Sequence, residues 1–382
     1  MVYMDYNATT PVRPEVLEAF LPFYRERFGN PSSIHWAGRP VKVALEEARE
    51  KVAELLNCEP LEVVFTSGGS EADNMAIKGV ATILRNSGNH IITTRIEHPA
   101  VLNSCLHLEQ NGCRITMLDV DREGIPDLAE LEAAITRETI LISVMAANNE
   151  TGVLMPVSEI GELAARRRIY FHCDAVQAAG KLPIDCQELQ TGLLSISGHK
   201  LGGPKGIGAL VVRKGMKLHP LVHGGSQERN RRAGTENVPG IVGLGMACEL
   251  AQASLLSDEP RRLERLRGRL ETGILARIPN AHVNGSSAKR LPNTSNLSFI
   301  GLDADSLLVS LDLQGIAASS GAACGSGTLK TSHVLEAMGL DPSISRGSVR
   351  FSLGRENTEA DVDFVLEALI SIVARLRTSG KK

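Results

Sequence analysis

Aromatic side chains are scarce in this sequence, and several common binding signatures are missing from it. The formal net charge is only −3 and like charges do not gather in long runs, so nothing predicts a nucleic-acid-binding surface. No apolar run is long enough to cross a membrane, and the first residues lack the basic and then apolar profile of a signal peptide. These absences predict a cytoplasmic protein that binds neither nucleic acid nor membranes.

The cysteines do not follow the patterns of metal sites or disulfide frameworks. The chain has seven, an odd number, and no two are spaced as CxxC. Together with the missing signal peptide, this predicts reduced thiols and no metal site. Two nucleotide-binding motifs, GxxxxGK[ST] and a full GxGxxG, are also absent, which removes the main support for an NTPase or a Rossmann dinucleotide-binding enzyme.

The chain instead alternates between short β-rich runs and helical patterns. The helical patterns between the runs indicate βαβ units and a largely parallel sheet. The runs lack a clean alternation of apolar and polar residues, which is typical of strands covered on both faces. Seven strands are expected, at residues 62–66, 90–96, 114–118, 140–145, 169–174, 193–197 and 208–213. We therefore expect an α/β fold with a mainly parallel seven-stranded sheet flanked by helices.

The 382 residues are enough for two domains. The composition shifts near residues 254–260, and the later part mixes helical patterns with few strands. We place a large domain at 14–258 and a smaller α+β domain at 259–382, and we assign residues 1–13 to the smaller one. The sequence alone leaves open whether this N-terminal arm packs there.

One lysine lies in an unusual setting, directly after the expected strand at 193–197. Lys200 is enclosed in the glycine-broken turn Ser197–Pro204. A lysine that must become a neutral amine and form a Schiff base needs desolvation and neighbouring cationic groups, whereas a surface lysine does not. An ordinary solvated lysine in a Gly/Pro turn is the alternative, and the rest of the chain has to decide between them.

A Gly/Ser turn follows the first expected strand of the sheet and opens a helix. Its sequence, TSGGSEAD at residues 66–73, has two glycines that let backbone N–H groups approach an anion closely. Ser70 and Asp73 also have the spacing of a capping box. A phosphate site and an ordinary capped helix start are both consistent with this turn.

Polar residues follow three more of the expected strands: His98, Asn149, Asp174 and, one helical turn later, Gln177. The carboxyl ends of parallel strands are where open α/β sheets hold their ligands. A satisfied surface histidine, a polar turn and a capping aspartate are the corresponding ordinary explanations. At the level of single residues these alternatives stay open.

Taken together, these segments resemble fold-type I pyridoxal-phosphate enzymes, and among them the cysteine desulfurases of the NifS/IscS kind. The resemblance spans nearly the whole chain, and its motifs occur in the family's order. The further motifs are DYNATTP at 5–11, RRAGTEN at 231–237, SSGAAC at 319–324 and RFSLGR at 350–355. The segment 231–237 is similar to the NifS-like branch in particular. The resemblance implies a homodimeric transferase with pyridoxal 5'-phosphate as cofactor.

The resemblance also implies roles for the residues at the strand ends. Lys200 would hold the cofactor as a Schiff base and later move the α-proton of the substrate. Asp174 would pair with the pyridine nitrogen and keep it protonated, so that the ring can accept negative charge. His98 would stack on the ring and assist proton transfer.

Further residues would bind the phenolic oxygen, the substrate and the phosphate. Gln177, with Asn149 nearby, would address the phenolic oxygen or the substrate. Arg350 would bind the substrate carboxylate, for which its planar fork is suited. The phosphate would be held by Gly69, Ser70, Ser197 and His199, with Thr235 reaching it from the second subunit.

Cys324 would decide which reaction the enzyme performs. It lies in a Ser/Gly/Ala-rich segment, whereas the other cysteines lie in contexts typical of buried thiols. In the family this thiolate attacks the sulfur of L-cysteine, which leaves a persulfide on the enzyme and releases L-alanine. The expected partners are L-cysteine, a second copy of the chain and a sulfur-accepting scaffold protein of the IscU/NifU kind for iron–sulfur cluster assembly. A selenocysteine lyase, another class V enzyme, a sulfur donor for tRNA thiolation and a silent scaffold are the alternatives.

Overall fold

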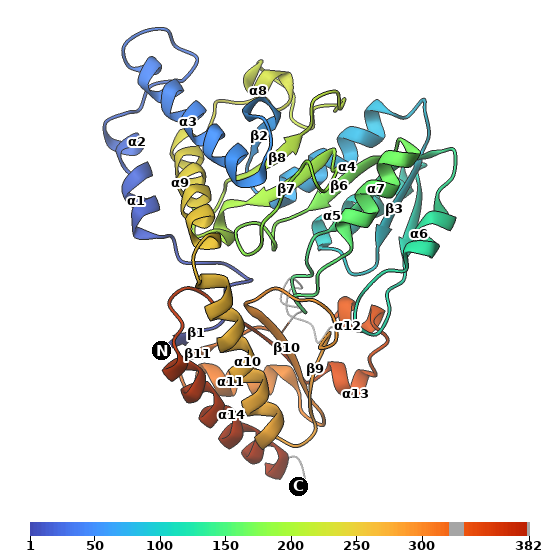
Figure 1. Cartoon of the computed structure of the whole chain (residues 1–382). Coiled ribbons are helices and arrows are strands. Elements are labelled where there is room, and N and C mark those ends of the chain that lie inside the picture. Colours follow the sequence, from blue (N-terminus) through green and yellow to red (C-terminus); the bar gives the residue numbers. More distant parts are fainter. Residues whose placement is uncertain (321–331, 380–382) are drawn as a thin grey trace.

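The computed structural model describes residues 1–320 and 332–379. In Figure 1 a large sheet with helices forms the upper part, and a smaller group of strands and helices forms the lower part. The chain crosses from one to the other between α9 (Val238–Leu255) and α10 (Glu259–Arg277). The expected division at residue 258 lies in this crossing, and the domain limits stay a prediction.

The main sheet is assembled from strands spread over residues 63–212. They are β2 (Val63–Thr66), β3 (His90–Thr94), β4 (Arg114–Leu118), β5 (Thr139–Met145), β6 (Tyr170–Asp174), β7 (Leu193–Ser197) and β8 (Gly208–Val212). Within the described residues this sheet has seven strands in the order β2-β8-β7-β6-β5-β3-β4. Only β8 runs against its neighbours β2 and β7. The expected α/β fold with a mainly parallel sheet is confirmed, and each strand ends within two residues of its expected limits.

Successive residues of the strands enter two hydrophobic clusters on opposite faces of this sheet. In β8, Ala209 and Val211 belong to the larger cluster, and Leu210 and Val212 belong to the other. The first face is covered by α3 (Gly38–Leu56), α7 (Val157–Arg167) and α9, and the second by α4 (Gly69–Ile83) and α5 (Pro99–Gln110). Because both faces are buried, the strands need no polar side, which explains the missing alternation in the sequence.

Shorter helices complete the upper part. Near the N-terminus the chain forms two short helices in place of one. The second begins at Pro22, because proline has no N–H to donate within a helix. One described helix, α9, has the length and apolar composition of a membrane span, and half of it is buried inside the protein, where it packs along α3. The remaining elements are α1 (Pro14–Phe20), α2 (Pro22–Arg25), η1 (Pro60–Glu62), α6 (Leu128–Ala134), η2 (Gly198–Lys200) and α8 (Gln227–Asn230).

The lower part has its own sheet and core, and the N-terminal arm belongs to them. In this sheet β10 (Thr294–Phe299) lies between β12 (Ser348–Ser352) and β9 (Ala281–Val283), antiparallel to both. β1 (Val2–Tyr3) pairs in parallel with β11 (Ile316–Ala317), and Val2 and Met4 are buried in the lower core. The other elements are α11 (Ala304–Asp312), α12 (His333–Ala337), α13 (Pro342–Ser345) and α14 (Glu359–Ser379).

Candidate active site

The carboxyl ends of the parallel strands open onto one cavity of about 590 Å³. Ligand sites in open parallel sheets lie at this edge because the loops that leave the strands converge there. The predicted residues that line the cavity are Gly69, Ser70, His98, Asn149, Asp174, Gln177, Ser197, His199 and Lys200, and Arg350 of β12 joins them from the lower part. The structure thus brings together residues that are up to 281 positions apart, from Gly69 to Arg350.

Lys200 ends η2, the short turn that follows β7. Its Nζ donates hydrogen bonds to the backbone oxygens of Asn7, at 2.5 Å, and Ala8, at 2.9 Å. Both carbonyls belong to the N-terminal arm, and the carbonyl of Asn7 also accepts a bond from Gln177 Nε2 at 3.0 Å. The arm therefore sets the direction of the amine, a role that the sequence did not reveal.

Asp174 is the last residue of β6, and it is almost completely buried. Its Oδ1 accepts a hydrogen bond from the backbone N–H of Val176 at 2.9 Å. Burial raises the pKa of Asp174, while the nearby His98 and Lys200 lower it in part. A carboxyl group in this setting suits a cationic partner, because a charge-assisted hydrogen bond would stabilise its ionised form.

Two further buried acids lie near Asp174, and sequence reasoning gave Glu97 no role and Asp73 only a place in a capping box. Asp73 lines the cavity from α4, and burial, followed by repulsion from Asp174, holds its pKa well above the usual range. Glu97 Oε1 accepts bonds from Met145 N and Thr94 Oγ1, and burial raises the pKa of Glu97 to about 8. In the sequence, the only indication that Glu97 belongs to the site was its position next to His98, the histidine predicted at a strand end.

His98 begins α5, where its Nδ1 accepts a hydrogen bond from the backbone N–H of Ala100 at 3.1 Å. A neutral His98 therefore carries its proton on Nε2. Burial lowers the pKa of His98, the carboxylate of Asp174 raises it, and Lys200 and His333 lower it further. The lowered pKa favours the neutral form of the imidazole.

The start of α4 forms a close-fitting cradle. A Cβ on Gly69 would lie 2.8 Å from Val176 Cγ2, so this position has room only for glycine. The capping-box interpretation is wrong, because Gly68 is the N-cap and no side chain caps the helix, while Ser70 lies inside its first turn. The uncapped N–H groups and the dipole of a 15-residue helix favour an anion at this position.

Gln177 and Asn149 differ in how their side chains are used. Gln177 donates to Asn7 O, and its Oε1 accepts from the buried amine of Lys181 at 2.9 Å. Lys181 Nζ also bonds Asn7 Oδ1 at 2.9 Å, and burial lowers its pKa well below the usual range. By contrast, Asn149 Oδ1 is buried without a hydrogen-bond partner among the described residues.

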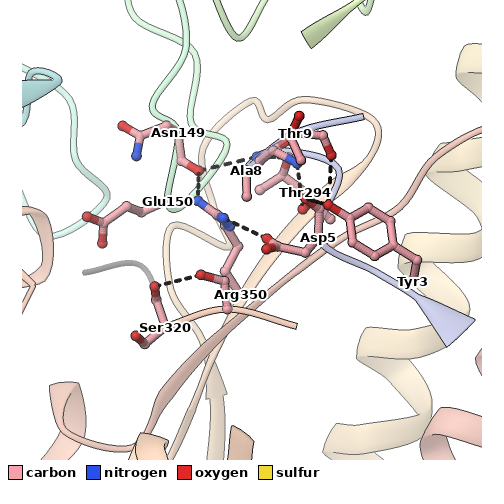
Figure 2. Close-up of polar contacts among 12 residues, drawn as sticks. Tyr3, Asp5, Ala8, Thr9, Asn149, Glu150, Thr294, Ser320 and Arg350 are labelled. Atoms are coloured by element: carbon pink, nitrogen blue, oxygen red, sulfur yellow. Dashed lines mark hydrogen bonds and ion pairs between the residues drawn. The ribbon is translucent and has the colours of Figure 1, made fainter. Parts of the chain in front are cut away.

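Arg350 lies between the N-terminal arm and the turn that carries Asn149 and Glu150, as Figure 2 shows. Its Nη2 pairs with Asp5 Oδ1 at 2.8 Å, and its Nη1 donates to the backbone oxygen of Asn149 at 2.9 Å. The side chain is only 4% exposed, and in the described part of the chain its Nε has no partner. A buried guanidinium with an unused donor that lines a cavity is suited to a carboxylate.

Comparison with known proteins accounts for this arrangement. A family model described as Aminotransferase class-V matches residues 2–365. The chain belongs to this family. A protein named Cysteine desulfurase IscS from Methanosarcina thermophila is 54% identical, over 98% of this chain and 93% of that protein. Another of the same name from Clostridium botulinum (strain Hall) is 52% identical, over 98% of this chain and 95% of its own length.

The solved structures agree with the relatives. One titled NifS-like protein superposes with a TM-score of 0.92 at 40% identity, and the match covers 98% of this chain and all of that one. The resemblance inferred from the motifs is confirmed, and this chain is a cysteine desulfurase of the class V family. Enzymes of this class depend in general on pyridoxal phosphate.

Two predicted residues of the desulfurase are not among those gathered at the cavity. Thr235 is exposed and lines a separate cavity, together with Arg232 and Glu236. Cys324 lies outside the described residues, which include Ser319 before it and Ser332 after it. Neither position tests the predicted role of its residue.

Proposed function

We propose that this desulfurase converts L-cysteine into L-alanine and keeps the sulfur as a persulfide on Cys324. One observation carries the proposal. A single cavity holds the amine of Lys200, the buried carboxyl of Asp174 and the guanidinium of Arg350. These are the three groups that a carbonyl cofactor with a basic ring nitrogen and an amino-acid substrate would require.

The walls of the cavity also fit pyridoxal 5'-phosphate. The glycine cradle at the start of α4 offers N–H groups to a phosphate, and Ser70, Ser197 and His199 line the same end. Burial and the neighbouring lysines lower the pKa of His199 to about 4, so the ring is a neutral partner there. When bound, this cofactor supplies an electron sink for negative charge that develops on the substrate.

The chain's own groups would divide the work. Lys200 would bind the cofactor's aldehyde carbon through Nζ and later move the α-proton of the substrate. Asp174 would hold the ring nitrogen in its protonated form by a charge-assisted hydrogen bond, which contributes roughly 1.5–3 kcal/mol. His98 would stack on the ring and keep a proton available at Nε2, the atom that its cap contact leaves protonated.

The remaining predicted contacts concern the substrate and the second subunit. Arg350 would bind the substrate carboxylate with its unused donors, and the unpaired Oδ1 of Asn149 marks it as a further partner for a bound group. Gln177 has one amide hydrogen left for the phenolic oxygen, because its other groups bond Asn7 and Lys181. Thr235 would reach the phosphate of the partner in a homodimer.

In the sulfur step, the Cys324 thiolate attacks the sulfur atom of the substrate. An S–S bond forms as the Cβ–S bond breaks, and the electron pair of that bond stays with the substrate carbon. Cβ then takes up a proton and alanine leaves. Carbon is reduced and sulfur is oxidised within the same pair of molecules, so no external oxidant is needed. We further propose that a scaffold protein in the cytoplasm accepts this sulfur for iron–sulfur cluster assembly.

The test is anaerobic incubation of the purified holoenzyme with L-cysteine. We expect alanine in solution and one extra sulfur on the peptide that contains Cys324, located by mass spectrometry. Cys324→Ala should lose the persulfide and the turnover, whereas Lys200→Ala should lose the visible colour of the bound cofactor. Full turnover of L-cysteine by Cys324→Ala would overturn the proposal and favour a lyase that does not use this thiol.

A further inference from the structure

The segment that carries Cys324 is attached at its two ends to two different hydrophobic cores. On the near side, β11 pairs with the N-terminal strand, and Ile316 is buried in the lower core. On the far side, Val334 and Leu335 of α12 belong to the larger cluster of the main sheet. The described residues on either side of the segment are therefore held by different parts of the protein.

The near end is tied to the proposed substrate-binding arginine. Ser319 and Arg350 exchange backbone hydrogen bonds, from Arg350 N to Ser319 O at 2.6 Å and from Ser319 N to Arg350 O at 3.2 Å. The guanidinium of the same residue bonds the backbone oxygen of Asn149, as Figure 2 shows. The near end and the substrate carboxylate site therefore share one residue.

The far end is tied to the turn that follows Asn149. Ser332 Oγ donates to Glu150 Oε2 at 2.5 Å, and Glu150 is only 2% exposed. The turn itself is rigid, because Asn148 Oδ1 accepts bonds from the backbone N–H groups of Glu150 and Thr151. The far end thus bonds the turn at residues 148–151 directly, and the near end is linked to the same turn through Arg350.

Capping of α12 does not explain this buried carboxyl. Ser332 Oγ already caps the helix by accepting from Leu335 N at 3.1 Å, and this needs no acidic partner. Burying a carboxyl group is costly unless it is hydrogen-bonded, and Ser332 supplies the bond to its Oε2. Helix capping alone therefore does not account for the hydrogen bond between Glu150 and Ser332.

We propose that Glu150 is a positioning residue for sulfur transfer. By holding Ser332, it fixes the far end of the Cys324 segment to the turn that also holds Arg350. The proposal rests on the proposed function, in which Cys324 receives the sulfur. Loss of the contact should slow transfer to Cys324 and leave the binding of the amino acid intact.

Four variants separate positioning from stability. Glu150→Ala removes the acceptor, whereas Glu150→Gln keeps an oxygen that can accept from Ser332 and should behave like the wild type. Ser332→Asp retains an acceptor that can cap α12 but places a second carboxylate against Glu150. Asp341→Ala is the matched control, because it removes the cap contact to Ser343 N in the neighbouring α13.

The holoenzyme is mixed with saturating L-cysteine under anaerobic conditions, quenched, and the persulfide on Cys324 is counted by mass spectrometry. We expect the transfer rate to fall by about tenfold or more in Glu150→Ala and Ser332→Asp, as for a lost hydrogen bond to a charged group. The affinity for L-alanine, followed by absorbance, should stay within about twofold. Without substrate, iodoacetamide should alkylate Cys324 faster in these two variants than in the wild type and Asp341→Ala.

Several outcomes would overturn the positioning role: a transfer rate within about twofold of the wild type in both variants, an L-alanine affinity that falls as much as the rate, or unchanged alkylation. Failure of Glu150→Gln to restore transfer would do the same. If Glu150→Ala does not fold, Ser332→Asp gives the answer. If the wild type forms no persulfide on Cys324, the proposed function fails instead, so the two failures are distinguishable.

Discussion

The two sides of the active site are built in different ways. On the main-sheet side, Asp174 ends β6, and Lys200 and His98 lie in the short segments that follow β7 and β3, so one edge of the sheet places all three. On the Arg350 side, the wall is assembled from the N-terminal arm, the turn at 148–151 and β12, which are separated by more than a hundred residues. The first side holds the groups proposed to handle protons, and the second holds the donors proposed for the substrate carboxylate. Chemistry and positioning are therefore expected to fail separately.

The largest effect should come from the main-sheet side. Asp174→Ala removes the carboxyl proposed to keep the ring nitrogen protonated, so kcat should fall at least about 100-fold, and the cofactor should be lost more readily on dialysis. Steady-state alanine formation and the visible spectrum of the dialysed protein measure the two effects. Turnover at the wild-type level would refute the assignment and remove the basis of the comparison.

On the Arg350 side we expect a change in KM. Arg350→Ala should raise KM for L-cysteine about 10- to 100-fold, because a charge-assisted pair that is present in both the ground and transition states is lost. Asp5→Asn is the matched variant, since it keeps an acceptor for Nη2, and it should change KM less than about fivefold. An unchanged KM in Arg350→Ala, or a loss confined to kcat, would show that the two sides do not divide the work.

The last effect concerns stability, not turnover, on the main-sheet side. Burial raises the pKa of Glu97 from 4.5 to about 8. A carboxyl with a raised pKa contributes stability that is complete below the unfolded value and is lost as the pH rises toward the folded value. The wild type should therefore lose more unfolding free energy than Glu97→Gln between pH 5 and 8, on the order of 1 kcal/mol per pH unit.

Urea unfolding of both proteins at several pH values measures this difference, with Glu109→Gln, at an exposed position of α5, the helix that follows Glu97, as control. Glutamine keeps an acceptor for Met145 N and Thr94 Oγ1, so the variant should fold. Parallel pH profiles of the wild type and Glu97→Gln would mean that Glu97 does not take up a proton on folding.

The sequence was informative where function follows from local position. Asp174 and Lys200 could be named as candidates because the first ends and the second closely follows a recognisable buried strand, and the strand ends of a parallel sheet converge. The resemblance to the family then supplied their expected roles. Gly69 could be chosen because a glycine at a helix start suits an anion. The sheet could be predicted for the same reason, because the alternation of strands and helices is visible in short stretches of the sequence.

The sequence was uninformative where function arises from contacts between distant segments. Asn7 lies in a motif that matched the family, yet nothing nearby shows that its carbonyl would meet an amine 193 residues away. Glu150 and Lys181 look like ordinary surface residues in the sequence. Only the fold shows that Glu150 bonds Ser332 and that Lys181 bonds Asn7. Thr235 was expected to act on a second subunit, a relation that one chain does not contain.

The contacts of the N-terminal arm bear on the order in which parts of the protein fold. Domains fold as they emerge from the ribosome, beginning with the first residues synthesised. The arm at residues 2–7 is synthesised before the main sheet, but its backbone N–H groups donate to Gly315, Ala317 and Ser352, which are synthesised long after that sheet. The main sheet is complete by Val212, long before those partners exist. We therefore expect the sheet to fold before the arm docks, so that the two acceptors of Lys200 are fixed in place only when the lower part has been made.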